Sequence, residues 1–238
     1  NLGATQPLGE FTIIQADGGV TFGESDLDEG PGTIGPVTMI ATDGAIDIGV
    51  LGNIINGGIL FNGGPDPLLL TTTDAPIRLN GQVTLGSSLE IDTNDIGFGG
   101  TVTFTSSATI DSQADERRDL TIDAGAQQVL FNNNIGETVP LGTFTITQAD
   151  GGITFGESGT DLGAGTTGPV STVTADGPID LGVDDNIIFA IVVLNAGIVP
   201  ITIESNFDRI RVNGPVTSLV DVILRAAEGI TLTDEADI

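Results

Sequence analysis

The sequence predicts an all-β fold, in the form of a parallel β-helix with turns of roughly 20–30 residues. Three observations support this prediction. Short segments alternate apolar and polar residues, a long internal repeat covers most of the chain, and no stretch has the pattern of a convincing amphipathic helix.

The alternating segments place an apolar residue on each side of a polar one, usually threonine, and glycine, asparagine or aspartate often bounds them. Period two is the pattern of a β-strand, with the apolar pair facing the core and the threonine facing outward. The segments are 11–13, 20–22, 102–104, 120–122, 144–146, 153–155, 201–203 and 230–232. Their spacing predicts about nine to eleven turns, with Phe11, Phe22, Phe104, Phe131, Phe144 and Phe155 stacked inside.

Helical character is weak everywhere in the chain. The best candidate is 218–228, which contains β-branched residues and ends at Gly229. β-branched side chains favour strands over helices. We therefore expect nearly all of the ordered structure to be β.

The internal repeat is visible by eye: PLGEFTIIQADGG at 7–19 returns as PLGTFTITQADGG at 140–152, an offset of 133 in the numbering. About 32 of the 49 positions from 7 to 55 are identical in the second copy. At the same offset 1–105 matches 134–238, so the chain begins inside a repeat. We interpret 1–238 as one continuous solenoid segment taken from a longer array.

A series of immunoglobulin-like sandwiches is the competing architecture, since a repeat of this length could form such a domain. The absence of tryptophan, tyrosine and cysteine argues against it. So do the short, evenly sized strands and the lack of a linker at the repeat boundary.

Charge excludes several functions. The 238 residues include 33 acidic and only 6 basic side chains, giving a net charge of −27, and all six basic residues are arginines. Nucleic-acid binding needs basic patches, so we expect no nucleic-acid partner. No apolar run approaches the roughly 20 residues of a membrane span, so we expect no membrane insertion.

Catalysis is also unexpected, because histidine, cysteine, lysine and tyrosine are all absent. Paired carboxylates could still act as general acid and base. The best candidates are Asp47 and its repeat equivalent Asp180, each between two apolar residues of a strand. We expect them to face outward as part of a solvated strand face, and we assign no catalytic residue.

Calcium is the one cofactor that the sequence suggests, because acidic loops offer the oxygen ligands that Ca²⁺ prefers. The candidates are Glu24, Asp26, Asp28, Asp184 and Asp185. Solvated acidic loops are the alternative, since no EF-hand spacing is present and the acidic pairs differ between the two copies. Asp92 with Asp95, and Asp115 and Glu116 near Asp119, are further acidic groups.

Arginines 209 and 211 alternate on one predicted strand, and Arg78 is the repeat equivalent of Arg211. Alternate residues share a face, so we expect both arginines to pair with carboxylates of the neighbouring turn. Surface pairs of this kind contribute little energy, and we interpret them as fixing strand register.

Three segments resemble the strand repeats of large secreted filamentous-haemagglutinin-like surface proteins: DLTIDAG at 119–125, QVLFN at 128–132 and PLGTFTI at 140–146. The resemblance implies a right-handed parallel β-helix, export to the cell surface, and a structural or adhesive role. It carries over no functional residue.

The sequence therefore predicts an extracellular, cell-surface protein with a structural role, as a stalk, fibre or surface layer that self-associates, with cations controlling assembly. The alternative is an adhesin that binds glycan or ice through threonine-rich faces. That alternative requires outward threonines to align over at least four successive turns on one flat face.

Overall fold

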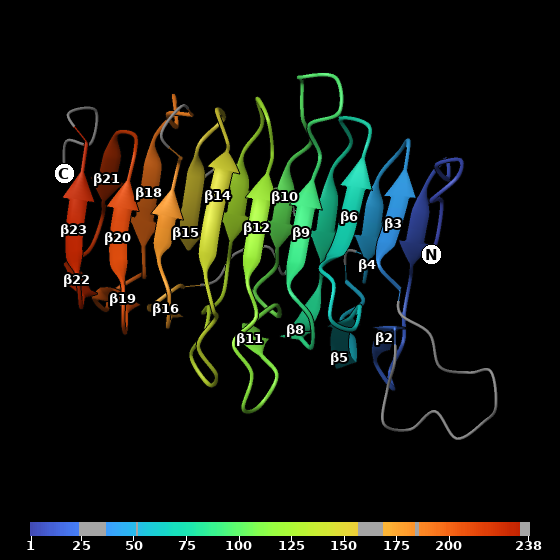
Figure 1. Ribbon diagram of the computed structural model, residues 1–238, viewed down its shortest axis with the longest axis horizontal. Helices are drawn as coiled ribbons and strands as arrows, with labels where there is room; N and C mark the ends of the chain where they lie inside the picture. The colour runs from blue at the N-terminus through green and yellow to red at the C-terminus, as the bar shows by residue number, and fades with distance from the viewer. Residues whose placement is uncertain (24–36, 51, 157–168, 184–185, 234–238) are drawn as a thin grey trace.

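The computed structural model describes residues 1–23, 37–50, 52–156, 169–183 and 186–233. Within these ranges the chain forms 23 β-strands and no helix, so none of the described residues form a helix that could span a membrane. Every pairing between named strands is parallel. The strands stack side by side along the long axis (Figure 1). The prediction of a parallel β-helix is confirmed.

Each turn passes in order through three sheets, which we call faces I, II and III. Face I contains β1 (Phe11–Ile13), β4 (Ile46–Ile48), β7 (Ile77–Leu79), β10 (Val102–Phe104), β13 (Val129–Phe131), β15 (Ile153–Gly156), β18 (Val192–Asn195) and β21 (Val216–Ser218). Face III contains β3 (Met39–Thr42), β6 (Leu68–Thr72), β9 (Leu89–Asp92), β12 (Leu120–Asp123), β14 (Phe144–Gln148), β17 (Ile179–Leu181), β20 (Arg209–Val212) and β23 (Gly229–Leu232).

Face II consists of two strand groups joined by a single residue. The first group is β2 (Val20–Gly23), β5 (Ile55–Asn62), β8 (Gly81–Leu85) and β11 (Ile110–Ser112). The second is β16 (Thr172–Ala175), β19 (Ile201–Ser205) and β22 (Val222–Ala226). Ile135 bridges both groups, pairing with Ile110 on one side and Val173 on the other. All three faces therefore continue across the boundary between the two sequence copies.

The described residues form eight turns, so the expectation of nine to eleven was too high. The reason is the unequal length of the connections between strands. Val129 and Ile153 are partners on face I and are joined by a short turn of the solenoid. Ile153 and Val192 are also partners on that face, yet a much longer stretch of chain separates them. The stretch 218–228, which had the best but weak helical character, forms no helix, and β22 (Val222–Ala226) lies within it, as the expectation of a nearly all-β fold requires.

The two sequence copies lie on different faces. Strands β1, β4 and β7 are on face I, whereas their repeat equivalents β14, β17 and β20 are on face III. The register is the same in both, since Phe11 pairs with Ile46 and Phe144 pairs with Ile179. From β1 to β14 the chain advances by 14 strand positions, with the bridge of Ile135 counted as one of them. One repeat is therefore four and two-thirds turns, which rotates the second copy by one face.

One continuous apolar core fills the space between the faces. Phe104, Phe131 and Phe155 stack along face I, with ring centroids 5.0 and 5.2 Å apart. Phe144 meets this stack edge-on. All four side chains are fully buried, Phe22 is 6% exposed, and Phe11 packs against the core while remaining partly exposed. The predicted internal phenylalanines are confirmed.

Glycine is required where two turns approach most closely. Gly23 and its repeat equivalent Gly156 have φ values of 103° and 96°. A Cβ atom at either position would lie 1.6 Å from a backbone oxygen of the next turn, that of Asn62 or Asn195. Only glycine fits both the left-handed backbone and the contact.

Candidate functional site

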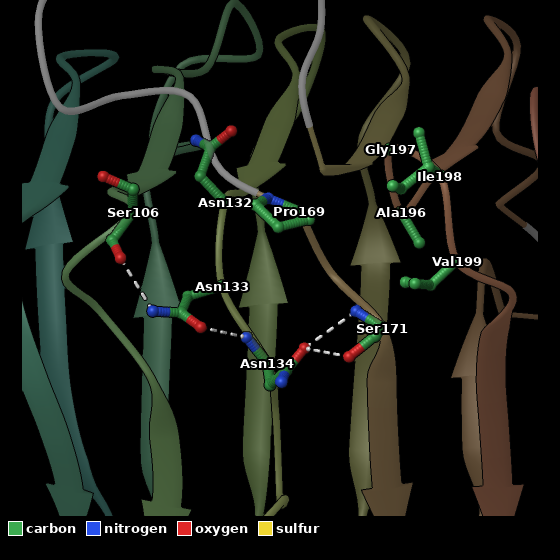
Figure 2. A pocket seen from close by; sticks show the side chains of 10 residues that line it. All are labelled: Ser106, Asn132, Asn133, Asn134, Pro169, Ser171, Ala196, Gly197, Ile198 and Val199. Atoms are coloured by element: carbon green, nitrogen blue, oxygen red, sulfur yellow. Dashed lines mark hydrogen bonds between the residues drawn. The ribbon is translucent and has the colours of Figure 1, made fainter.

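A pocket of about 620 Å³ opens at the corner between faces I and II (Figure 2). It extends over four successive turns, because its lining residues follow β10, follow β13, precede β16 and follow β18. Ten of the described residues line it: Ser106, Asn132, Asn133, Asn134, Pro169, Ser171, Ala196, Gly197, Ile198 and Val199. None of them is charged, in a chain of net charge −27.

Hydrogen bonds fix the polar wall of this pocket. Nδ2 of Asn133 donates to the backbone oxygen of Ser106 at 2.7 Å, and Oδ1 of Asn133 accepts from the Asn134 amide at 2.8 Å. Oδ1 of Asn134 accepts from the backbone amide of Ser171 at 2.8 Å and from its hydroxyl at 3.3 Å (Figure 2). These bonds connect three successive turns, so the wall is held by the solenoid and not by one loop.

Asn132 belongs to a buried polar row that runs along the end of face I. The row starts at Asn80, whose Nδ2 donates back to Asn53 O at 3.0 Å and whose Oδ1 accepts from the Thr105 hydroxyl of the next turn at 2.7 Å. Nδ2 of Asn132 likewise donates back, to Phe104 O at 3.1 Å. Both amides thus donate to the preceding turn, and Asn80 also accepts from the following turn.

The row is interrupted immediately after Asn132. Phe131 pairs with Phe155, so the position beside Asn132 in the following turn is Gly156, which has no side chain. Asn132 is 1% exposed, and none of the described residues donates a hydrogen bond to its Oδ1. A buried acceptor without a donor is costly, and this one belongs to a residue that lines the pocket.

The opposite wall of the pocket is apolar. Ala196, Ile198 and Val199 lie across from Asn133 and Asn134 in Figure 2, with Pro169 between the two walls. Ile198 is 100% exposed and Val199 is 45% exposed. The pocket therefore offers amide and hydroxyl groups on one side and a hydrocarbon surface on the other.

Sequence reasoning missed this pocket, because its residues come from four turns separated by tens of positions. The one available signal was the run of three asparagines at 132–134. Asparagine in a β-helical sequence is also a common turn residue. The three asparagines therefore did not show whether this segment forms a binding site or an ordinary turn between two strands.

The sequence-predicted calcium candidates Glu24, Asp26, Asp28, Asp184 and Asp185 all lie outside the described residues. Among the residues that the structure does describe, no three acidic side chains come together in a way that could hold a metal ion. The calcium hypothesis therefore gains no support from the described acidic groups.

Two carboxylates are brought side by side on face III. Asp92 and Asp123 are partners in adjacent turns. Burial raises the pKa of Asp123 above its usual value, and the neighbouring charge of Asp92 raises it further, against the lowering effect of a hydrogen bond from the Gly125 amide at 2.9 Å. Sequence reasoning grouped Asp92 with Asp95, its neighbour along the chain, and did not identify the contact between Asp92 and Asp123 of the adjacent turn.

The arginines pair with carboxylates of the neighbouring turn, as predicted. Asp180 lies between Arg209 and Arg211, at 3.1 and 3.2 Å. Asp47, its repeat equivalent, forms a two-pronged pair with Arg78, in which Arg78 Nε lies 3.0 Å from Oδ1. Both aspartates occupy outward positions of their strands, but the arginines cover them. The expectation of a solvated strand face is wrong for Asp180, which is only 6% exposed. All six arginines of the chain form ion pairs.

Outward threonines do not form long rows among the described strands. Thr121 and Thr145 are neighbours on face III, but Glu90 and Asp180 flank them. On face I, Asp47 and Arg78 separate Thr12 from Thr103. Thr172 pairs with Thr202 on face II, and Ile223 follows. The rows contain at most two successive threonines, half of the four that a flat binding face requires.

Comparison with known proteins adds no assignment. No protein-family profile, no curated protein and no solved structure matches this chain.

Proposed function

We propose that this protein is a structural, extracellular β-solenoid that acts as a stalk, fibre or surface layer at the cell surface, of the filamentous-haemagglutinin-like kind. One observation carries the proposal. All three faces continue from the first sequence copy into the second, through the pairs β12–β14 on face III and β13–β15 on face I, and through the isolated bridges of Ile135 on face II. Additional copies could extend the same rod.

The rotation between copies supports a rod more than a single binding face. Each repeat advances by four and two-thirds turns, so the same outer residues come to a different face in each copy. Three copies would complete 14 turns and restore the original face. An array of this kind distributes its surface features around the axis, which suits a stalk or filament that has no preferred side.

The surface charge supports exposure to solvent and cation-controlled packing. Among the described residues, the six arginines are engaged with five of the chain's 33 acidic residues, which leaves a large acidic excess. Such a surface repels other copies until ions screen it. We therefore expect lateral association of rods to depend on salt or on divalent cations, and we assign the protein no enzymatic activity.

The test is cryo-electron microscopy of the native material, with and without a calcium chelator. Parallel strands stack at about 4.8 Å, so one repeat should advance about 22 Å along the axis and three repeats about 67 Å. Fibres with both spacings would support the proposal. Compact particles whose length does not grow with the number of repeats would overturn it. Unchanged bundling in the chelator would reject only the role of calcium.

A further inference from the structure

We propose that Asn56 is a site of spontaneous deamidation, and that the fold protects the other three Asn-Gly steps of the chain from the same reaction. The four steps begin at Asn56, Asn62, Asn80 and Asn213. The proposal rests on how differently the solenoid holds these four side chains. It does not depend on whether the chain forms fibres.

The reaction needs only the chain and water. Glycine has no Cβ, so its backbone nitrogen can approach the side chain of a preceding asparagine with little hindrance. The nitrogen of Gly57 attacks Cγ of Asn56, the bond from Cγ to Nδ2 breaks, and the amide proton of Gly57 leaves with Nδ2 as ammonia. Water then opens the succinimide ring to give aspartate or isoaspartate. The product carries an additional negative charge.

Two of the four asparagines are buried and held in the same way. Asn80 and its repeat equivalent Asn213 are 5% and 6% exposed. Nδ2 of Asn80 donates to the backbone oxygen of Asn53 at 3.0 Å. Nδ2 of Asn213 donates to the backbone oxygen of Val183 at 2.9 Å. Ring closure would require each side chain to give up a buried hydrogen bond, which is costly, so both steps should react slowly.

At the third step the attacking nitrogen is already engaged. The backbone amide of Gly63 donates to the hydroxyl oxygen of Ser87 in the next turn at 2.7 Å. Ser87 is fully buried. Oδ1 of Asn62 accepts from the Gly64 amide at 3.4 Å. The Gly63 nitrogen must leave Ser87 before it can attack, and Asn62 is therefore protected as well.

Asn56 is held much less firmly than the other three. Both Asn56 and Gly57 are exposed. Nδ2 of Asn56 donates to Oδ1 of the exposed Asp17 at 3.2 Å. The backbone is irregular here, because β5 pairs with β8 through Ile55 and next through Ile59, with a register shift between the two. A bulge of this kind leaves its extra residues outside the ladder, so Asn56 can reach the geometry of ring closure without unfolding the turn.

The reaction changes a contact between the first two turns. Hydrogen bonds from Gln15 and, to a smaller extent, from Asn56 lower the pKa of Asp17 below its usual value of 3.8. In the product a carboxylate stands opposite Asp17, so repulsion replaces the hydrogen bond. Phe189 occupies the equivalent position in the second copy, and the reaction therefore affects the first copy alone.

The test is incubation of the folded chain at mildly alkaline pH, followed by peptide mapping with mass spectrometry at each of the four steps. We expect Asn56 to convert at least about tenfold faster than any of the other three asparagines. In a parallel sample unfolded in urea, all four should convert at rates within about threefold of one another, because only the fold distinguishes them. Isoelectric focusing of the folded sample should show the added negative charge.

Asn56→Gln is the matched variant, because glutamine keeps an exposed amide at this position but would have to close a larger ring. It should remove the fast conversion and leave the rates at the other three steps unchanged, and its melting midpoint shows that it folds. The proposal is overturned if Asn62, Asn80 or Asn213 converts as fast as Asn56 in the folded chain. It is also overturned if Asn56 stays intact over a period in which the urea sample converts.

Discussion

The two copies of the repeat contain the same strands in different surroundings. Phe11 and Phe22 form an edge-on pair with centroids 6.1 Å apart, and their equivalents Phe144 and Phe155 form one at 6.4 Å. The second pair is fully buried, whereas Phe11 remains partly exposed. The same residues therefore make the same local contact in both copies and differ in how much of the solenoid surrounds them.

This difference teaches that burial in a solenoid depends on the turns on either side. Phe144 has strand partners in both directions, Leu120 and Ile179. Among the described strands, Phe11 has a partner on one side, Ile46. Stability in such proteins is a sum of turns and of interfaces between neighbouring turns. Equivalent substitutions in the two copies can measure the interface contribution directly.

The largest difference should come from the phenylalanine pair. Phe144→Ala removes a fully buried ring between two turns and should lower the free energy of unfolding by about 3–5 kcal/mol. Phe11→Ala removes a partly exposed ring and should cost about 1–2 kcal/mol. Urea denaturation followed by circular dichroism measures both. Equal losses would mean that neighbouring turns contribute little to the packing of this residue.

Glycines 9 and 142 provide a second matched pair. A Cβ at Gly142 would lie 2.4 Å from Oδ1 of Asp119 and 2.8 Å from the backbone oxygen of Arg117, while a Cβ at Gly9 would meet nothing within 4 Å. Gly142→Ala should therefore cost about 1–3 kcal/mol through overpacking. Gly9→Ala should change stability by less than about 0.5 kcal/mol. Thermal melting distinguishes the two, and a large loss from Gly9→Ala would contradict the interpretation.

Equivalent aspartates make a third, smaller comparison. Asp180 neutralises two arginines and its side chain is 9% exposed, whereas Asp47 pairs with one arginine and is 19% exposed. Asp180→Asn should cost about 1–3 kcal/mol, because two arginines lose their charge partner in a more buried site. Asp47→Asn should cost about 1 kcal/mol or less. The reverse order of losses in chemical denaturation would show that burial does not control these pairs.

The sequence predicted the regular parts of the molecule well. The alternation in segments such as 144–146 was enough to identify strands, inward phenylalanines and outward arginines, because each depends on local period two. It did not identify the unequal lengths of the connections between strands, so the number of turns was overestimated. The rotation between copies was also hidden, since it depends on Ile135, a single bridging residue without a strand pattern.

The candidate site was the least predictable part, for a related reason. The sequence pointed to acidic loops, and those residues lie outside the described part of the chain. The pocket depends instead on which positions become neighbours across turns, such as Asn132 beside Gly156. Turn-to-turn neighbours are set by the lengths of irregular connections, which carry no periodic signal.

The smallest predicted effect concerns Asp123, which lies between the matched segments 1–105 and 134–238. Its pKa is raised above the value of 3.8, by burial first and by Asp92 second. The folded state therefore binds the proton more tightly than the unfolded state. This carboxyl group destabilises the fold increasingly as pH rises through the window from 3.8 upward to its folded pKa.

Asp123→Asn should consequently stabilise the protein modestly at neutral pH, and the gain should disappear as pH falls below that window. Asn can still accept the hydrogen bond from the Gly125 amide. The matched control is Asp221→Asn, which removes the same charge from an exposed position and reports the general benefit of lowering a net charge of −27. Melting curves at pH 7 and near pH 3 measure both variants. If the two variants gain equally at pH 7, the effect belongs to the overall charge of the solenoid, and neither the burial of Asp123 nor its contact with Asp92 contributes.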